Sequence, residues 1–175
     1  PLDIPTGIRY SYGEALLMLK LRNSLMGQVD NLGNNGLFKT PTDAVEWIEE
    51  HFRIPETPDH RIILAPYQKA CLKEALSLDD QGDFKYSVII WSDIKKSIKS
   101  TIAAAVALWR AWMVNWGQIT LVANDLKGAD SRVGYFLRRA IELNPPMHNQ
   151  CKMVNYKTTL PNRTYIESVP IDPTG

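Results

Sequence analysis

The sequence has 175 residues, of which 45% are hydrophobic, and its 20 Lys and Arg residues balance 19 Asp and Glu residues. A chain of this size buries roughly 70% of its unfolded surface and needs no disulfides or metals to fold. The balanced charge excludes nucleic acid binding through overall charge and leaves only local basic patches for that role. We therefore expect one main domain with a small appendage.

Cysteine usage and hydropathy point to a soluble protein in a reducing compartment. Cys71 and Cys151 lie far apart without C-x-x-C spacing, which argues against zinc binding and against a disulfide framework. The longest apolar stretch, residues 102–109, falls short of the roughly 20 residues that span a bilayer. We expect a cytoplasmic, soluble protein.

Residues 1–60 are predicted to form a helical N-terminal subdomain. Apolar periodicity predicts a helix over residues 11–26, and Gly and Asn residues predict a loop over 28–39. The stretch Thr40 to Asp43 is a helix-start signal for a second helix over residues 44–52.

Residues 61–175 are predicted to form the second and larger domain. A helix is expected over residues 67–78, and the short apolar run YSVIIW at residues 86–91 predicts a buried strand. The alanine-rich stretch that begins at Ile102 favours a helix. Its tryptophans Trp109, Trp112 and Trp116 recur with helical spacing and are predicted to be core or domain-contact residues.

The remaining elements complete an α/β pattern. Residues 118–123 predict a second buried strand, and residues 130–143 predict a helix. Strands that alternate with helices imply a parallel sheet. Two β-rich runs around Pro161 and Asn162 predict a C-terminal β-hairpin. The expected fold is therefore α/β, with a P-loop NTPase-like parallel sheet flanked by helices.

The loop before the alanine-rich helix has the residues of a phosphate-binding site. Lys99, Ser100 and Thr101 occupy the G-K-[ST] end of the P-loop motif, in which backbone amides and the lysine bind phosphates and a hydroxyl reaches Mg²⁺. Lys95 and Lys96 add positive charge beside the expected helix N-terminus. The alternative is a solvated basic loop, but the order of strand, loop and helix favours phosphate binding.

Both glycine positions of the motif hold other residues, Asp93 and Ile98. A left-handed conformation at Ile98 costs about 1–2 kcal/mol, which weakens affinity roughly 5- to 30-fold. The sequence leaves open whether Ile98 adopts that conformation.

Two other groups of residues are candidate ligand contacts. A glutamine such as Gln68 can pair with both the donor and the acceptor of the adenine edge, although a surface role is the alternative. After the second predicted strand come Asn124, Asp125, Lys127 and Arg132, where open α/β sheets bind ligands. These four side chains could contact a nucleotide or DNA, and a turn with a helix cap is an equal alternative.

Taken in order, Tyr67-Gln68, VIIW, SDIKKSIKSTIAAAVALW and VANDLKGADSRV resemble the N-terminal ATPase half of bacteriophage large terminase subunits, over roughly residues 62–175. The resemblance implies ATP and Mg²⁺ as cofactors and Gln68 at adenine. It implies a P-loop over residues 95–101 that includes Ser97 and Ile98, with Lys95 or Lys96 as its basic residue and Ser100 as the metal ligand.

The resemblance also implies a role in packaging viral DNA. The expected partners are double-stranded DNA, the portal, the small terminase subunit and further copies of the chain, in the cytoplasm of a bacterial host. The family's acidic Asp-Glu strand should follow the hairpin, and Ile166-Glu167 does not supply it. Because phosphoryl transfer needs such carboxylates, we expect a fragment that binds ATP better than it hydrolyses it.

Two alternatives remain. The chain could be a fragment of a helicase-like ATPase, since those enzymes also place a glutamine upstream of a P-loop. It could instead be a degenerate P-loop module that acts in protein interaction without nucleotide, for which Ile98 is the best support.

Overall fold

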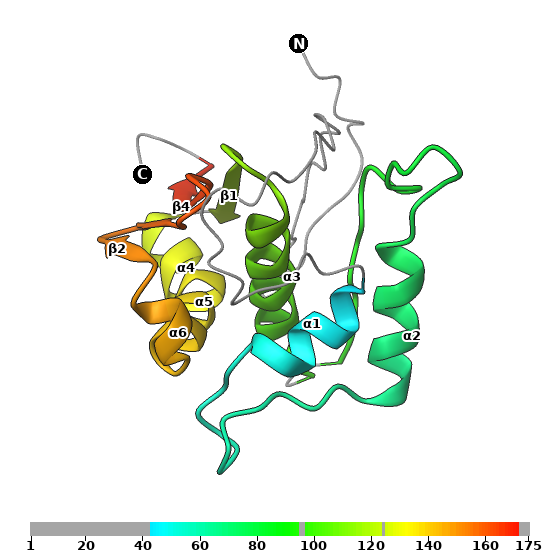
Figure 1. Ribbon diagram of the computed structural model, residues 1–175, viewed down its shortest axis with the longest axis horizontal. Helices are drawn as coiled ribbons and strands as arrows, with labels where there is room; N and C mark the ends of the chain where they lie inside the picture. Colours follow the sequence, from blue (N-terminus) through cyan, green and yellow to red (C-terminus); the bar gives the residue numbers. More distant parts are fainter. Residues whose placement is uncertain (1–42, 95–96, 124, 172–175) are drawn as a thin grey trace.

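The computed structural model describes residues 43–94, 97–123 and 125–171. In chain order its elements are α1 (Ala44–His51), α2 (Pro66–Ala75), α3 (Lys99–Met113), β1 (Gln118–Ala123), α4 (Leu126–Ala129), the π-helix η1 (Asp130–Gly134), α5 (Tyr135–Glu142), α6 (Pro145–His148), β2 (Lys152–Val154), β3 (Lys157–Thr159) and β4 (Tyr165–Pro170). Figure 1 shows α3 between α2 on one side and the group of α4, α5 and α6 on the other. None of the described helices is long and apolar enough to cross a membrane.

The core is built around α3. Every residue from 101 to 109 is buried, as expected for a helix that is covered on several sides. The helix contacts α1, α5, β1 and β4. The predicted core positions of Trp109 and Trp112 are confirmed, but Trp116 is 71% exposed. Trp116 lies beyond the end of the helix. The Arg163 guanidinium carbon lies over its ring instead, 4.4 Å from the Trp116 ring centroid.

The four strands form one mixed sheet in the order β1-β4-β3-β2. Only β1 and β4 pair in parallel, whereas β3 pairs antiparallel with both β2 and β4. The hairpin predicted around Pro161 and Asn162 is confirmed as β3 and β4. The predicted P-loop-type parallel sheet is not confirmed, because strands joined by short turns must be antiparallel and these strands supply most of the sheet.

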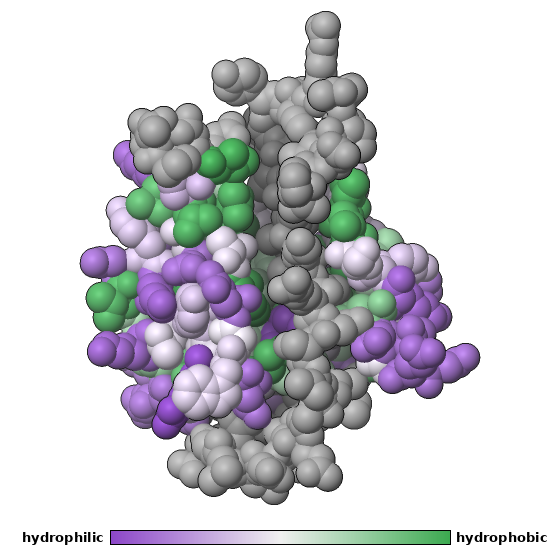
Figure 2. Space-filling view, turned by 90° about the horizontal axis from the view of Figure 1, so that it is seen from above, coloured by the Kyte–Doolittle hydropathy of each residue, from purple (hydrophilic) through white to green (hydrophobic). Residues whose placement is uncertain are grey.

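The strand predicted over residues 86–91 is also absent. The segment is extended, with Ile89 and Trp91 packed against the core, while Val88 and Ile90 are 55% and 70% exposed. No described strand pairs with it, and an extended segment becomes a strand only through such pairing. Figure 2 shows apolar surface in green on both the β-strand side and the α2 side of the molecule.

The other predicted helices agree with the structure in outline. α1 has the predicted start, and α2 ends at Ala75 rather than at residue 78. The helix predicted over residues 130–143 starts earlier, with α4, and passes through η1 into α5. The helix and loop predicted over residues 11–39 lie outside the described residues.

Candidate functional site

Hydrogen bonds join the first turn of α2, the described loop residues 92–94 and 97–98, and the first turn of α3 at one end of the molecule, at the bottom of Figure 1. Segment 86–91 leads into the loop, and Ile98 is the N-cap residue of α3. Ile98 has φ 56° and ψ 25°, in the left-handed region. The loop therefore makes the turn that the motif would assign to glycine, with a β-branched residue in its place.

Ile98 is a strained residue. A β-branched side chain in this region costs about 1–2 kcal/mol, and the side chain is 41% exposed, so burial compensates only part of that cost. Residues held in unfavourable backbone conformations cluster at functional sites. The strain at Ile98 therefore makes the loop before α3 a candidate functional site.

The first-turn N–H groups at the N-terminus of α3 are hydrogen-bond donors that the helix itself does not use. No side chain caps this end of the helix, and the first helical bond runs from the Ile102 N–H to the Ile98 carbonyl. The N–H groups of Lys99, Ser100 and Thr101 therefore have no partner within the helix. Together with the helix dipole, such amides favour an anion. Ser100 is half-buried, whereas the Thr101 side chain is buried.

The ammonium group of Lys99 is held over the loop. Its Nζ donates to the carbonyl oxygens of Asp93 at 2.6 Å and of Ile94 at 2.7 Å. No carboxylate among the described residues forms an ion pair with it. The hydrogen bonds of the Lys99 ammonium among the described residues are thus to neutral backbone carbonyls, and the nearby Asp93 carboxylate interacts with it through charge alone.

Asp93 brings a carboxylate into the same loop. Its Oδ1 accepts from the Ile94 N–H at 2.7 Å, and its Oδ2 accepts from the Tyr67 hydroxyl at 3.1 Å. The Ile94 N–H is the main cause that lowers the pKa of Asp93, and the hydroxyls of Tyr67 and Ser97 and the Lys99 charge act in the same direction against partial desolvation. Desolvation and the Asp93 carboxylate raise the pKa of Tyr67, which keeps its hydroxyl a donor.

Gln68 is buried, with 4% of its surface exposed, so the surface alternative for this residue is wrong. Its Oε1 accepts from the Ala65 N–H at 2.9 Å, and its Nε2 donates to the Tyr67 hydroxyl oxygen at 3.3 Å. The amide caps the start of α2, where Ala65 has no side chain to do so. Gln68 and Lys99 are therefore connected through Tyr67 and Asp93.

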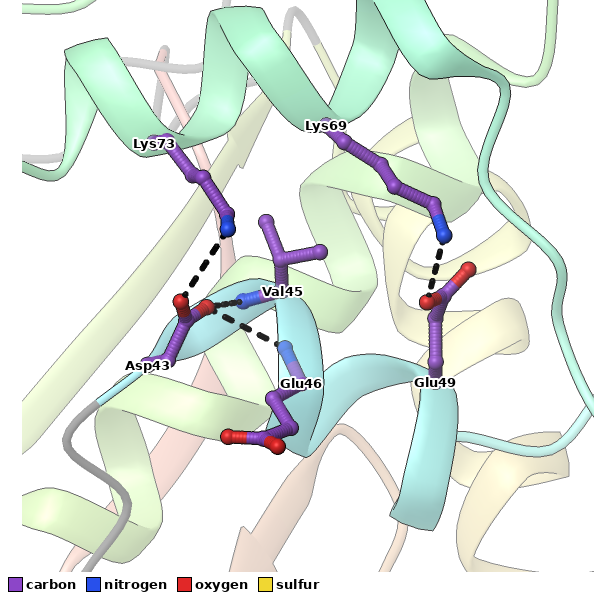
Figure 3. A pocket seen from close by; sticks show the side chains of 6 residues that line it. All are labelled: Asp43, Val45, Glu46, Glu49, Lys69 and Lys73. Carbon is purple, nitrogen blue, oxygen red and sulfur yellow. Dashed lines mark hydrogen bonds and ion pairs between the residues drawn. The ribbon is translucent and has the colours of Figure 1, made fainter.

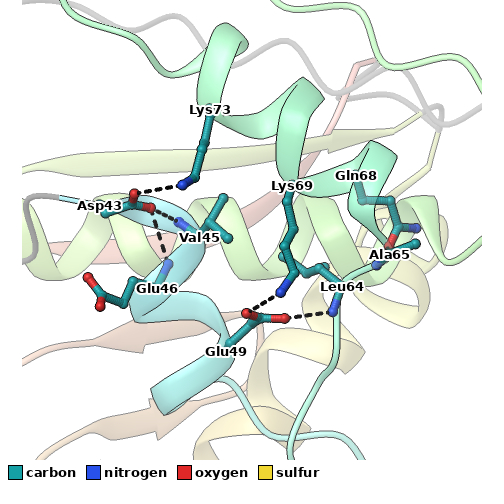
Figure 4. Close-up of polar contacts among 9 residues, drawn as sticks. All are labelled: Asp43, Val45, Glu46, Glu49, Leu64, Ala65, Gln68, Lys69 and Lys73. Atoms are coloured by element: carbon teal, nitrogen blue, oxygen red, sulfur yellow. Dashed lines mark hydrogen bonds and ion pairs between the residues drawn. The ribbon is translucent and has the colours of Figure 1, made fainter.

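Salt bridges hold α2 on α1. Figure 3 shows Lys69 and Lys73 reaching from α2 toward the carboxylates of Glu49 and Asp43, at 2.8 and 3.5 Å. The residues line a depression of about 270 Å³. In Figure 4, Glu49 also accepts from the Leu64 N–H, two residues before the start of α2. These contacts fix the helix that carries Gln68.

Glu49 is ionised by this arrangement. Desolvation alone would raise the pKa of Glu49, but the hydrogen bonds from Lys69 and from the Leu64 N–H, together with the Lys69 charge, outweigh it and lower the pKa. The lysines of the depression are thus neutralised by the α1 carboxylates. We assign this depression a structural role.

The candidates after β1 lie apart from the loop. Asp125 accepts from the Gly128 N–H at 2.6 Å and caps α4, in agreement with the helix-cap alternative. Lys127 and Arg132 are exposed, and no described hydrogen bond or ion pair joins them to residues 92–98. Asn124, Lys95 and Lys96 lie outside the described residues.

Sequence reasoning did not propose Tyr67 and Asp93 as functional residues. The available signals were the position of Tyr67 beside Gln68 and the position of Asp93 at the first motif glycine. No group of three or more His, Cys, Asp or Glu side chains among the described residues is arranged to hold a metal ion.

No protein-family model and no curated protein matches the sequence. Among solved structures, the chain is similar to the HK97 bacteriophage large terminase, with a TM-score of 0.60 and 18% sequence identity. The fold is terminase-like. The match covers 73% of this chain and 26% of the terminase chain, so the present chain spans about a quarter of its neighbour's length. The fold expected from the sequence resemblance is thereby confirmed at a coarse level.

Proposed function

We propose that this chain is the ATP-binding part of a terminase-like packaging ATPase, and that the phosphates of ATP bind at loop 92–98 and the first turn of α3. The position of Lys99 carries the proposal. Its ammonium lies over a loop that turns through a left-handed residue into an uncapped helix N-terminus. An ammonium group beside free backbone amides is a donor set suited to phosphate oxygens.

The remaining donors fit the other parts of Mg²⁺-ATP. The Ser100 hydroxyl would hold Mg²⁺, which neutralises charge on the phosphate oxygens when bound. The Gln68 amide would contact the adenine edge once it releases its cap interactions. Lys95, Lys96 and Ser97 complete the proposed loop.

The similarity to a phage large terminase supports a role in DNA packaging. The proposed partners are double-stranded viral DNA, the portal, the small terminase subunit and other copies of the chain, in the host cytoplasm. The exposed Lys127 and Arg132 are the described residues that we propose contact DNA or nucleotide. Asp125 supports them by capping α4.

We propose that these 175 residues bind ATP with little turnover. Phosphoryl transfer needs carboxylates that hold the metal and position the attacking group. Among the described residues, Asp93 supplies the one carboxylate of the loop. That carboxylate already accepts hydrogen bonds from the Ile94 N–H and the Tyr67 hydroxyl.

The test is titration of a fluorescent ATP analogue with Mg²⁺ against the wild type, Lys99→Ala and Lys152→Ala, in parallel with a phosphate-release assay. Lys152 is an exposed lysine on β2 and provides a matched loss of charge away from the loop. We expect saturable binding by the wild type and Lys152→Ala, at least tenfold weaker binding by Lys99→Ala, and little phosphate release.

Absence of saturable binding by all three proteins would contradict the proposal. It would favour the second candidate, an interaction module that keeps the fold without nucleotide. The Asp93 carboxylate and the branched Ile98 at the two glycine positions favour that second candidate.

A further inference from the structure

A continuous chain of hydrogen bonds runs from Gln68 to Lys99. Gln68 Nε2 donates to the Tyr67 oxygen, the Tyr67 hydroxyl donates to Asp93 Oδ2, and the Asp93 carbonyl accepts from Lys99 Nζ. Tyr67 is the link between α2 and the loop. Its ring is 53% exposed, so core packing does not explain its position.

The two oxygens of the Asp93 carboxylate are both occupied by donors other than Lys99. Oδ1 accepts from the Ile94 N–H and Oδ2 from the Tyr67 hydroxyl. Yet the Lys99 ammonium is bonded to the carbonyl of the same residue, at 2.6 Å. Rotation of the Asp93 side chain would bring opposite charges together. A carboxylate paired with Lys99 would compete with any anion for that ammonium.

We propose that Tyr67 is a positioning residue that holds the Asp93 carboxylate away from Lys99 and so keeps the ammonium available to phosphate. The inference rests on the proposed function, because it concerns the same loop. It explains how an anion-binding loop tolerates an acidic residue at a motif glycine. Asp93 is then an internal competitor, and the Tyr67 hydroxyl restrains it.

Inorganic tripolyphosphate separates this effect from base recognition, because it has no adenine to contact Gln68. We would measure its dissociation constant at low salt for the wild type, Tyr67→Phe, Asp93→Asn and the double variant. Tyr67→Phe is expected to weaken binding about two- to fivefold, the range for one partly exposed charge pair. Asp93→Asn is expected to strengthen binding about fivefold, and adding Tyr67→Phe to it should change nothing further.

Tyr86→Phe is the matched control. The Tyr86 hydroxyl donates to Glu74 Oε1 at 2.6 Å, and the residue is 42% exposed. This variant removes the same type of tyrosine–carboxylate hydrogen bond away from the loop and should bind tripolyphosphate as the wild type does. Amide exchange at Ile94 in the ligand-free proteins should be faster in Tyr67→Phe and unchanged in Tyr86→Phe.

The outcomes are distinct. If the wild type binds tripolyphosphate and Tyr67→Phe binds it equally well, or if the effect of Tyr67→Phe persists in Asp93→Asn, the inference is overturned and the proposed function stands. If the wild type binds neither tripolyphosphate nor ATP, the proposed function is overturned, and with it the role of Tyr67 in anion binding. If amide exchange at Ile94 is unchanged in Tyr67→Phe, then Tyr67 does not restrain the Asp93 side chain, and the inference is overturned regardless of the binding results.

Discussion

The two ends of α3 are built in opposite ways. At the C-terminal end, Asn162 Nδ2 donates to the carbonyls of Ala111 at 2.8 Å and Val114 at 2.9 Å, and the Thr164 hydroxyl also donates to Val114. At the N-terminal end no side chain caps the helix, which begins after the left-handed Ile98. One end satisfies its orphan carbonyls with buried side chains, whereas the other keeps backbone strain and first-turn amides that no described side chain caps. Stability and proposed binding are thus assigned to opposite ends of one helix.

The largest effect should come from the C-terminal end. Asn162→Ala removes the donor to the Ala111 carbonyl and the acceptor of the Thr164 N–H, whereas Val114 keeps the Thr164 hydroxyl; buried polar groups left unpaired cost about 1–3 kcal/mol each. We expect a loss of about 2–4 kcal/mol in the free energy of unfolding, measured by urea denaturation. Asn115→Ala, at a nearby exposed position, should cost less than about 0.5 kcal/mol. If the two variants lose equal free energy of unfolding, then the Asn162 hydrogen bonds do not stabilise the C-terminal end of α3.

The strain at the N-terminal end can be released by a single substitution. Ile98→Gly removes a penalty of about 1–2 kcal/mol, partly offset by about 0.5–1 kcal/mol of extra backbone entropy in the unfolded chain. We expect a net gain of about 0.5–1 kcal/mol in the free energy of unfolding, measured by urea denaturation.

Ile98→Ala is the matched control for this prediction, because alanine keeps the Cβ that causes the left-handed penalty. It should show no gain in stability. If Ile98→Gly unfolds more easily than the wild type, then the left-handed residue is not strained and the contrast between the two ends of α3 is weaker than proposed.

The contacts that hold α2 beside the loop should contribute less than Asn162, because they are partly exposed. Glu49→Gln removes the charge that pairs with Lys69, and we expect a loss of about 0.5–1 kcal/mol at pH 7. The folded state lowers the pKa of Glu49, so its stabilisation is present above the unfolded pKa and is lost as the pH falls through the folded value. The difference between wild type and variant should therefore shrink below about pH 4.3. A difference that stays constant down to pH 3 would contradict this assignment.

The sequence predicted elements whose pattern is local. The alanine-rich α3, the strand β1 and the turn at Pro161 and Asn162 follow from composition and turn chemistry, and the structure contains all three. The segment 86–91 was assigned to a strand because its apolar pattern indicates extended backbone, but pairing depends on a partner that a pattern does not specify. The parallel sheet failed for the same reason, since the neighbour of β1 is β4, from far along the chain.

The structure brings two of the predicted site residues together through contacts that the sequence did not predict. Lys99 and Gln68 were named from motif spacing, and the structure joins them through Tyr67 and Asp93. In the P-loop motif, Asp93 stands at a position that is usually glycine. The motif states which residue is usual there, and it does not predict which hydrogen bonds a different residue forms. The buried capping role of Gln68 likewise depends on Ala65, which offers no capping group of its own.

The smallest expected effect is a difference in chemical reactivity between the two cysteine thiols, Cys71 and Cys151. Cys71 is exposed on α2, whereas Cys151 is partly buried just before β2. Burial raises the pKa of the Cys151 thiol from 9.0 to about 12, which lowers its reactive thiolate population about a thousandfold near neutral pH. Labelling with a thiol reagent at pH 8 should therefore modify Cys71 quickly and Cys151 only after denaturant is added. Cys71→Ser should abolish the fast phase, as read by mass spectrometry. Rapid labelling of Cys151 in native buffer would mean that the segment before β2 opens locally, and would contradict its burial in the folded protein.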